Sequence, residues 1–157
     1  GVDAVKLEGG SEIIDTVKGI LAAGIPVVGH LGLTPQSVHK FGGYGVRAKE
    51  EAEADKLLKD AKLLNDAGVC ALVLEKVPRS LAAEVSKQIE APTIGIGAGC
   101  DTDGQVLVYA DALGMTHEFK PKFLRHFADV SKCMTAGITD YMKCVKEQTF
   151  PNTDESY

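Results

Sequence analysis

The chain has 157 residues, of which 45% are hydrophobic and 25% are charged, and its formal net charge at pH 7 is -5. This composition is typical of a globular protein with one hydrophobic core. Because no apolar run reaches the roughly 18 to 20 residues of a spanning helix, we expect no membrane segment. The acidic balance and the lack of a clustered Lys/Arg stripe argue against nucleic acid as the main partner, but they permit a small anionic substrate.

Two stretches of the chain follow one template, namely residues 1–8 (GVDAVKLE) and residues 68–75 (GVCALVLE). Each is a short apolar run rich in Val, Leu and Ala, which is typical of a strand in a parallel sheet covered by helices. Each also ends in a glutamate, and α/β barrels hold their chemistry at the carboxyl ends of such strands. The template therefore predicts that Glu8 and Glu75 belong to one site, although two glutamates that simply face solvent would follow the same pattern.

Strands and helices alternate after the first of these stretches. Ser11 can cap a helix that ends at Gly24, and a strand over residues 27–31 (VVGHL) follows. That strand leads into a long connection over residues 32–49, in which Thr34-Pro35 is a helix-start signal. The elements expected next are a helix over residues 50–67, a strand over residues 69–75, a helix over residues 79–89 and a strand over residues 93–97.

The C-terminal third is expected to be helical and then polar. Residues 123–146 predict two helices, and the buried positions expected on them are Phe123, Phe127, Val130, Ile138, Met142 and Val145. Residues 148–157 read as a polar tail that we expect to be loose. We therefore assign residues 1–147 to a single domain and residues 148–157 to the tail.

The four cysteines of the chain, Cys70, Cys100, Cys133 and Cys144, show neither CxxC spacing nor a nearby pair of histidines. Reduced thiols are therefore the default, which favours a cytoplasmic location, or a mitochondrial one if the source is eukaryotic. The missing spacing also argues against a structural zinc site. Cys70 lies inside a predicted strand, where we expect it to be a small core residue.

The order of the elements predicts an α/β fold. Four β/α units in series, with strands that begin near residues 2, 27, 69 and 93, imply a parallel sheet. A complete (β/α)8 TIM barrel takes about 250 residues, and this chain begins abruptly in a strand without an initiator Met. We therefore interpret it as roughly the C-terminal half of a TIM barrel, with four β/α units and C-terminal helices. The competing architecture is a small doubly wound sheet, against which the first strand lacks a G-x-G-x-x-G turn.

Strand alternation sharpens the expected site. Lys6 and Glu8 lie two residues apart and so share a face, and Glu75 is the last residue of its strand on that same interior face. A lysine within Val-Lys-Leu is costly to bury alone, so Lys6 either forms a structural ion pair or faces a ligand together with Glu8. His30 lies near the end of the neighbouring strand and is either structural or part of the site. The glycine-rich residues 95–99 (GIGAG) allow a backbone to approach a ligand closely.

Several separate motifs occur in an order that resembles one known enzyme family. They are VKLEGG (residues 5–10), GIPVVGHLGLTPQS (24–37), GGY (42–44), LVLEKVP (72–78), PTIGIGAG (92–99) and DGQVLV (103–108). Together they are similar to ketopantoate hydroxymethyltransferase. The resemblance implies a (β/α)8 barrel enzyme that transfers a hydroxymethyl group from 5,10-methylenetetrahydrofolate to 3-methyl-2-oxobutanoate, giving 2-dehydropantoate for pantothenate and coenzyme A biosynthesis. It also implies Mg²⁺ as cofactor and a large homo-oligomer, often a decamer.

The resemblance assigns roles to four residues. Lys6 corresponds to a lysine that binds the oxo-acid substrate, Glu8 to a magnesium ligand and Glu75 to the catalytic proton acceptor, while His30 corresponds to a histidine near the substrate. Lys76 departs from the smaller residue, such as Cys, expected after that acceptor, and its side chain should point away from the interior. The family takes two further magnesium-binding aspartates from an N-terminal half, so we expect this chain alone to be inactive.

Two rival functions stay open at this point. One is another magnesium-dependent barrel that acts on a 2-oxo acid or a phosphate compound, like the phosphoenolpyruvate mutase and isocitrate lyase group. A nucleophilic cysteine on a strand-end loop would favour it, and none is evident at the matching place. The other is an inactive half-barrel that self-associates through exposed sheet edges.

Overall fold

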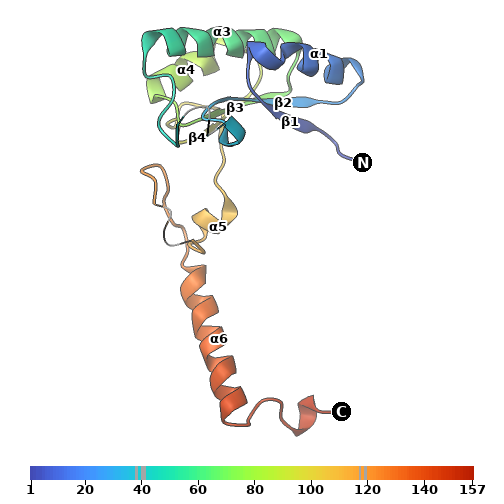
Figure 1. The fold of residues 1–157 in the computed structure, drawn as a ribbon, viewed down its shortest axis with the longest axis vertical. Helices are drawn as coiled ribbons and strands as arrows, with labels where there is room; N and C mark the ends of the chain where they lie inside the picture. The colour runs from blue at the N-terminus through green and yellow to red at the C-terminus, as the bar shows by residue number, and fades with distance from the viewer. Residues whose placement is uncertain (38, 40–41, 117, 119) are drawn as a thin grey trace. The chain divides into compact units, whose positions relative to one another are not determined.

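The computed structural model describes residues 1–37, 39, 42–116, 118 and 120–157, so part of the long connection predicted over residues 32–49 lies outside the described residues. The chain divides into two compact units, Gly1–Val106 and Leu107–Tyr157. Both units are drawn in Figure 1, and each is considered by itself below.

The first unit is built on a parallel sheet of five strands. They are β1 (Val5–Glu8), β2 (Val27–Gly32), β3 (Ala71–Glu75), β4 (Thr93–Ile96) and β5 (Gly104–Gln105). The strands lie in chain order, and each pairs in parallel with the next. The four predicted strands are confirmed. The fifth is an addition, because two residues are too few to show any alternation of apolar and polar side chains.

Helices connect these strands at the predicted places. They are η1 (Ser11–Ile13), α1 (Ile14–Ala22), η2 (Pro35–Ser37), α3 (Glu51–Ala67) and α4 (Arg79–Gln88). The expected cap at Ser11 is wrong, because Ser11 is already the first residue of η1 and its backbone N–H donates to Asp60 Oδ1 of α3 at 3.1 Å. The first N–H of this helical turn is therefore satisfied by a side chain from another helix and not by a neighbouring residue in the sequence. Gly68 ends α3 in the left-handed conformation, with φ of 96°, as the predicted stop signal requires.

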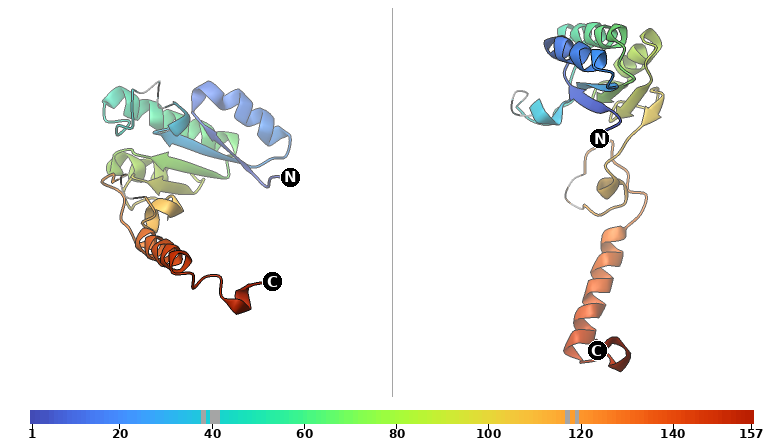
Figure 2. Two further views of the ribbon diagram at one scale, coloured as in Figure 1. Left: turned by 60° about the horizontal axis from the view of Figure 1, so that its bottom comes forward. Right: turned by 90° about the vertical axis from the view of Figure 1, so that its right-hand side faces the viewer.

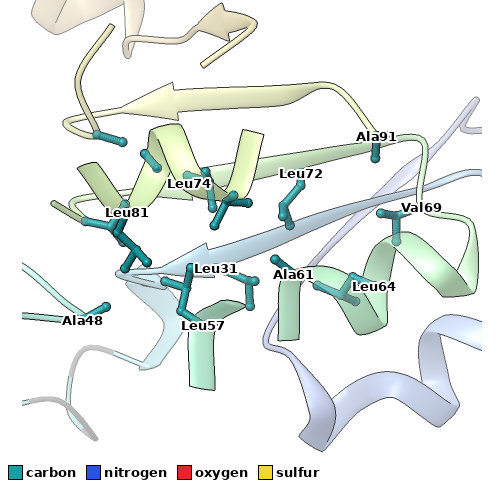
Figure 3. Close-up of a cluster of buried hydrophobic side chains, with 14 of the residues drawn as sticks. Leu31, Ala48, Leu57, Ala61, Leu64, Val69, Leu72, Leu74, Leu81 and Ala91 are labelled. Atoms are coloured by element: carbon teal, nitrogen blue, oxygen red, sulfur yellow. The ribbon is translucent and has the colours of Figure 1, made fainter. Parts of the chain in front are cut away.

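The three long helices of this unit cover one face of the sheet (Figure 1). The buried apolar cluster lies between that face and the helices, and it includes Leu31 and Leu72 from the strands and Leu57, Leu64 and Leu81 from α3 and α4 (Figure 3). Sequential strand order with helices on one side is the arrangement within a (β/α)8 barrel. A doubly wound sheet would reverse its strand order and carry helices on both faces. The sheet therefore fits part of a TIM barrel, and the doubly wound alternative is wrong.

The opposite face of the sheet carries the residues that alternate with this core. Lys6, Glu8, His30, Val73 and Glu75 lie on it by strand alternation and register. The three α-helices of the first unit, α1, α3 and α4, all lie on the other face (Figure 1), and two further views of the ribbon are given in Figure 2. Because parallel sheets are normally covered on both faces, this polar face is the one that a complete barrel would enclose.

Cys70 corrects a second expectation. It lies just before β3 rather than within it, it is exposed, and its thiol donates to the carbonyl oxygen of Val27 at 3.3 Å. The apolar run GVCALVLE starts as an extended segment, but the sheet pairing begins only at Ala71. The position is therefore at the amino end of the sheet, where a small polarisable side chain meets solvent.

The second unit contains α5 (Tyr109–Ala112), α6 (Val130–Lys146) and η3 (Thr153–Glu155). The expectation of two helices over residues 123–146 is wrong, because only α6 forms there. The backbone N–H groups of Phe127 and Val130 donate instead to carbonyl oxygens at the end of α5, and Asp129 then caps α6 by accepting from the Lys132 N–H at 3.1 Å.

Most of the positions expected to be buried in this unit are exposed. The exposed ones are Phe127 (63%), Ile138 (58%), Met142 (50%) and Val145 (44%). Ile138, Met142 and Val145 lie on α6, and the other helices in the described part of this unit are only about one turn long, so they leave most of its apolar stripe uncovered. Phe127 lies before α6 begins. No helix in the described part of the chain is long and apolar enough to cross a membrane.

Candidate active site

The carboxyl ends of β1, β2 and β3 bring the predicted site residues together. The register of the sheet places Glu8 beside His30 and Gly32 beside Glu75. Because parallel strands all end at the same edge, side chains that are far apart in sequence meet there. Lys6, Glu8, His30 and Glu75 form one group, as the sequence predicts.

His30 lies at the centre of this group. Its side chain is 2% exposed, its Nδ1 atom lies 3.1 Å from Lys6 Nζ, and its Nε2 atom lies 3.3 Å from Glu75 Oε2. The Glu8 carboxylate is also close, with Oε1 3.7 Å from His30 Nδ1. The imidazole therefore separates the two glutamates and contacts the lysine, which excludes the alternative that both glutamates simply face solvent.

Glu8 is held by two different kinds of donor. Its Oε1 atom lies 3.5 Å from Lys6 Nζ, and its Oε2 atom accepts a hydrogen bond of 3.1 Å from the backbone N–H of Gln36. Gln36 lies in η2, the single turn of helix that the Thr34-Pro35 signal predicts. Sequence reasoning missed this contact. Almost every residue has a backbone N–H, so the residue type does not reveal which one will donate, and the position of the Gln36 N–H depends on the path of the connection.

Two glycines let the chain turn tightly beside these carboxylates. A Cβ atom at Gly10 would lie 2.2 Å from Asp60 Oδ2, so only glycine allows α3 to approach the end of β1 this closely. Gly32 has φ of 90°, and a Cβ there would lie 2.3 Å from the carbonyl oxygen of Glu75. That oxygen accepts the Leu33 N–H at 2.8 Å, so Gly32 couples the exit of β2 to the end of β3.

Lys76 follows Glu75 in a left-handed conformation, with φ of 48°. Its side chain donates to the carbonyl oxygen of Tyr44, and its own carbonyl oxygen accepts the Arg47 N–H at 2.8 Å. Its backbone N–H donates to Ile96 O at 2.9 Å. Lys76 thus joins the end of the long connection to the ends of β3 and β4. The sequence shows that Lys76 differs from the residue expected in the family, but it does not predict these contacts.

The glycine-rich residues 95–99, which include the end of β4, pack against the chain's own side chains. A Cβ at Gly99 would lie 2.3 Å from Arg79 Cγ, and one at Gly95 would lie 2.7 Å from Thr102 Oγ1. Packing of this kind explains why glycine is needed at these two positions. Nearby, hydrogen bonds from the backbone N–H and then the hydroxyl of Thr93 hold the pKa of Asp103 below its usual range.

A cavity of about 590 Å³ opens beside Glu8, between the ends of β1 and β2 and the first half of α3. Its polar lining includes Glu8, Thr34, Arg47, Lys56 and Asp60. Asp60 is buried and pairs with Lys56, and this hydrogen bond and charge raise the pKa of Lys56 although its burial alone would lower it. The cavity thus carries both signs of charge next to the site.

The described residues contain no group of three or more His, Cys, Asp or Glu side chains that is arranged to hold a metal ion. Glu8 has the oxygen ligands that Mg²⁺ prefers, but His30 and Lys6 occupy the space on one side of its carboxylate. Any magnesium site at Glu8 would therefore need further oxygen ligands from outside the described part of this chain.

Comparisons with known proteins agree on one family. The sequence model described as "Ketopantoate hydroxymethyltransferase" matches residues 1–153. Among curated relatives named 3-methyl-2-oxobutanoate hydroxymethyltransferase, the protein of Phocaeicola vulgatus is 60% identical over 99% of this chain, that of Christiangramia forsetii 60% over 100%, and that of a Thermoanaerobacter species 55% over 100%. The chain covers 57%, 58% and 57% of their respective lengths, so it spans little more than half of each relative.

Proposed function

The chain belongs to the ketopantoate hydroxymethyltransferase family, and on that premise we propose that the protein of which it is a part transfers a hydroxymethyl group to 3-methyl-2-oxobutanoate. The one-carbon donor in this proposal is 5,10-methylenetetrahydrofolate, and the product, 2-dehydropantoate, serves pantothenate and coenzyme A biosynthesis. The observation that carries the proposal is the meeting of Lys6, Glu8, His30 and Glu75 at one edge of the sheet.

Glu75 is the base in this proposal. The reaction needs a proton removed from C3 of the 2-oxo acid, so that C3 can form a bond to the one-carbon unit. A carboxylate suits this step when it lies at a strand end, faces the enclosed side of the sheet and is little exposed to water. Glu75 meets these conditions, because its side chain is 15% exposed, it lies on the face that a complete barrel would enclose, and its carbonyl oxygen is held by the Leu33 N–H.

Lys6 supplies positive charge to the substrate's oxygens. An ammonium group has three donors and no acceptor. One of them faces His30 Nδ1 at 3.1 Å and a second faces Glu8 Oε1 at 3.5 Å, while the side chain stays 48% exposed on the open face of the sheet. The third donor is therefore available to a carboxylate or an enolate oxygen of the substrate.

Glu8 contributes one carboxylate to the magnesium site of the proposal. When bound, Mg²⁺ would polarise the oxo and carboxylate oxygens of the substrate as a Lewis acid. The Gln36 N–H fixes the orientation of the Glu8 carboxylate independently of any metal. The remaining ligands of the Mg²⁺ ion would come from the part of the protein that this chain does not contain, so we assign no geometry to the magnesium site.

We place this chain in the C-terminal half of the (β/α)8 barrel, as the family resemblance implies; its sequential, one-sided sheet supports only that it is part of such a barrel. The remaining strands would then cover the polar face that carries Lys6 and Glu75. Assembly into a homo-oligomer and a cytoplasmic location are part of the proposal, and the chain on its own is expected to be inactive.

The proposal is tested on the full-length protein by proton exchange. With Mg²⁺ and without folate, it should exchange the C3 hydrogen of 3-methyl-2-oxobutanoate with deuterium oxide, which proton NMR detects as loss of the C3 signal. Glu75→Gln should keep substrate binding but lower the exchange rate by at least about a hundredfold, the scale of a lost general base. Glu90→Gln, an exposed glutamate after α4, is the matched control and should exchange at the original rate. An unchanged C3 signal with folded, magnesium-loaded protein would overturn the assignment.

A further inference from the structure

The buried nitrogen of His30 that faces Glu75 lacks a hydrogen bond. His30 Nε2 is one of the few buried side-chain polar atoms without a hydrogen-bond partner in the described part of the chain. It lies 3.3 Å from Glu75 Oε2, but the two groups are not aligned as a hydrogen bond requires. Because buried polar groups are normally paired, this atom calls for an explanation.

Lys6 determines which His30 nitrogen carries the proton. A neutral imidazole has one N–H donor and one acceptor nitrogen, whereas an ammonium group can only donate. Lys6 Nζ lies 3.1 Å from His30 Nδ1, so the hydrogen bond between them requires Nδ1 to accept. The proton of the neutral ring must then be on Nε2, the nitrogen that lies beside Glu75.

We infer that His30 is a positioning residue for Glu75, held by Lys6 in the tautomer with the proton on Nε2. The terminal torsion of a glutamate is broad, so we expect the carboxylate to rotate until Oε2 is in line with the N–H donor. That bond would fix one oxygen of Glu75 and leave Oε1 free to face the substrate. This inference rests on the proposed role of Glu75 as the base, and it gives Lys6 a second task besides binding substrate.

Two substitutions in the full-length protein separate the two nitrogens of His30. The side-chain amide of glutamine reaches the place of Nε2, whereas that of asparagine reaches the place of Nδ1. His30→Gln should therefore keep a donor at Glu75 and retain the C3 exchange rate to within about tenfold, while His30→Asn should lose about a hundredfold, the scale of a misplaced catalytic group. The loss should fall on kcat, with KM for the oxo acid changing little. Equal rates in the two variants, or a slower His30→Gln, would overturn the inference.

A measurement on the unmodified ring covers the case in which both variants misfold. Nitrogen NMR of ¹⁵N-histidine-labelled full-length protein distinguishes a protonated from an unprotonated ring nitrogen, and the ring signals of His30 are assigned through their correlation with the backbone signals of the same residue. We expect Nε2 to carry the proton, and Glu75→Gln to shift the Nε2–H resonance. A proton on Nδ1, or a signal indifferent to Glu75→Gln, would contradict the inference.

The two proposals fail in different ways. Absence of C3 exchange in the folded, magnesium-loaded wild-type protein counts against Glu75 as the base and so against the proposed function. The tautomer and its response to Glu75→Gln do not depend on turnover. A protein that exchanges normally but shows the proton on Nδ1 would therefore leave the proposed function intact and remove only the role given to His30.

Discussion

The two units of the chain differ in how far they bury their apolar side chains. In Gly1–Val106 the helices and the sheet bury a continuous cluster, in which Leu72 and Leu74 are fully inaccessible. In Leu107–Tyr157 the long helix α6 has an equally regular apolar stripe, yet Ile138 on that stripe is 58% exposed. The comparison teaches that amphipathic periodicity predicts that a helix forms, whereas burial also requires a surface for the stripe to cover.

The largest expected effect comes from truncating one apolar residue in each unit. In the 157-residue chain, Leu72→Ala should lower the free energy of unfolding by about 2 to 5 kcal/mol, because it leaves a cavity between the sheet and α3. Ile138→Ala should change it by no more than about 0.5 kcal/mol, because it removes an already exposed side chain.

Urea denaturation followed by circular dichroism measures both changes. If Ile138→Ala costs as much as Leu72→Ala, the stripe of α6 is packed in solution and the contrast between the two units disappears.

A second prediction tests the backbone that joins β2 to β3 within the first unit. Gly32→Ala should destabilise by about 1 to 3 kcal/mol, because alanine is strained at φ of 90° and its Cβ would meet the Glu75 carbonyl oxygen. Gly19→Ala is the matched control, since a Cβ there meets nothing within 4 Å and the residue lies inside α1. It should stabilise by about 0.5 to 1 kcal/mol.

Thermal unfolding of the two variants gives the result directly. Equal stabilities would show that the end of β3 adjusts to a side chain at position 32, and that the edge of the sheet near Glu75 is less rigid than the structure indicates.

The smallest expected effect is a pH dependence in the same unit. Bonds from Thr93 lower the pKa of Asp103 in the folded chain, so between that pKa and the unfolded value near 3.9 the unfolded state binds more protons. The stabilisation from Asp103 is therefore complete above the unfolded value and is lost as the pH falls through the folded pKa. Asp103→Asn should remove this part of the acid sensitivity.

Urea titrations at pH 5 and at successively lower pH compare the two proteins. A wild-type curve that stays parallel to that of Asp103→Asn down to the lowest pH would contradict the prediction. Thr93→Val keeps the backbone donor and should fall between them.

The candidate site was predictable because it depends on strand ends. Glu8 and Glu75 each end an apolar run and His30 lies near the end of another, and parallel strands that follow one another in sequence end at one edge. What could not be predicted is how these side chains contact one another. The sheet register sets His30 between the two glutamates, and the path of the connection sets the Gln36 amide against Glu8.

The alternation of apolar runs and turn residues by itself determined the four long strands, the three long helices of the first unit and the group of charged strand-end residues, because these depend on local periodicity. Only the tertiary structure decided the one-sided covering of the sheet, the exposure of Phe127 and Ile138, and the contact of His30 with Lys6 and Glu75. These features depend on which surfaces meet in the folded chain. The apolar pattern of one segment does not predict which other segment will cover it.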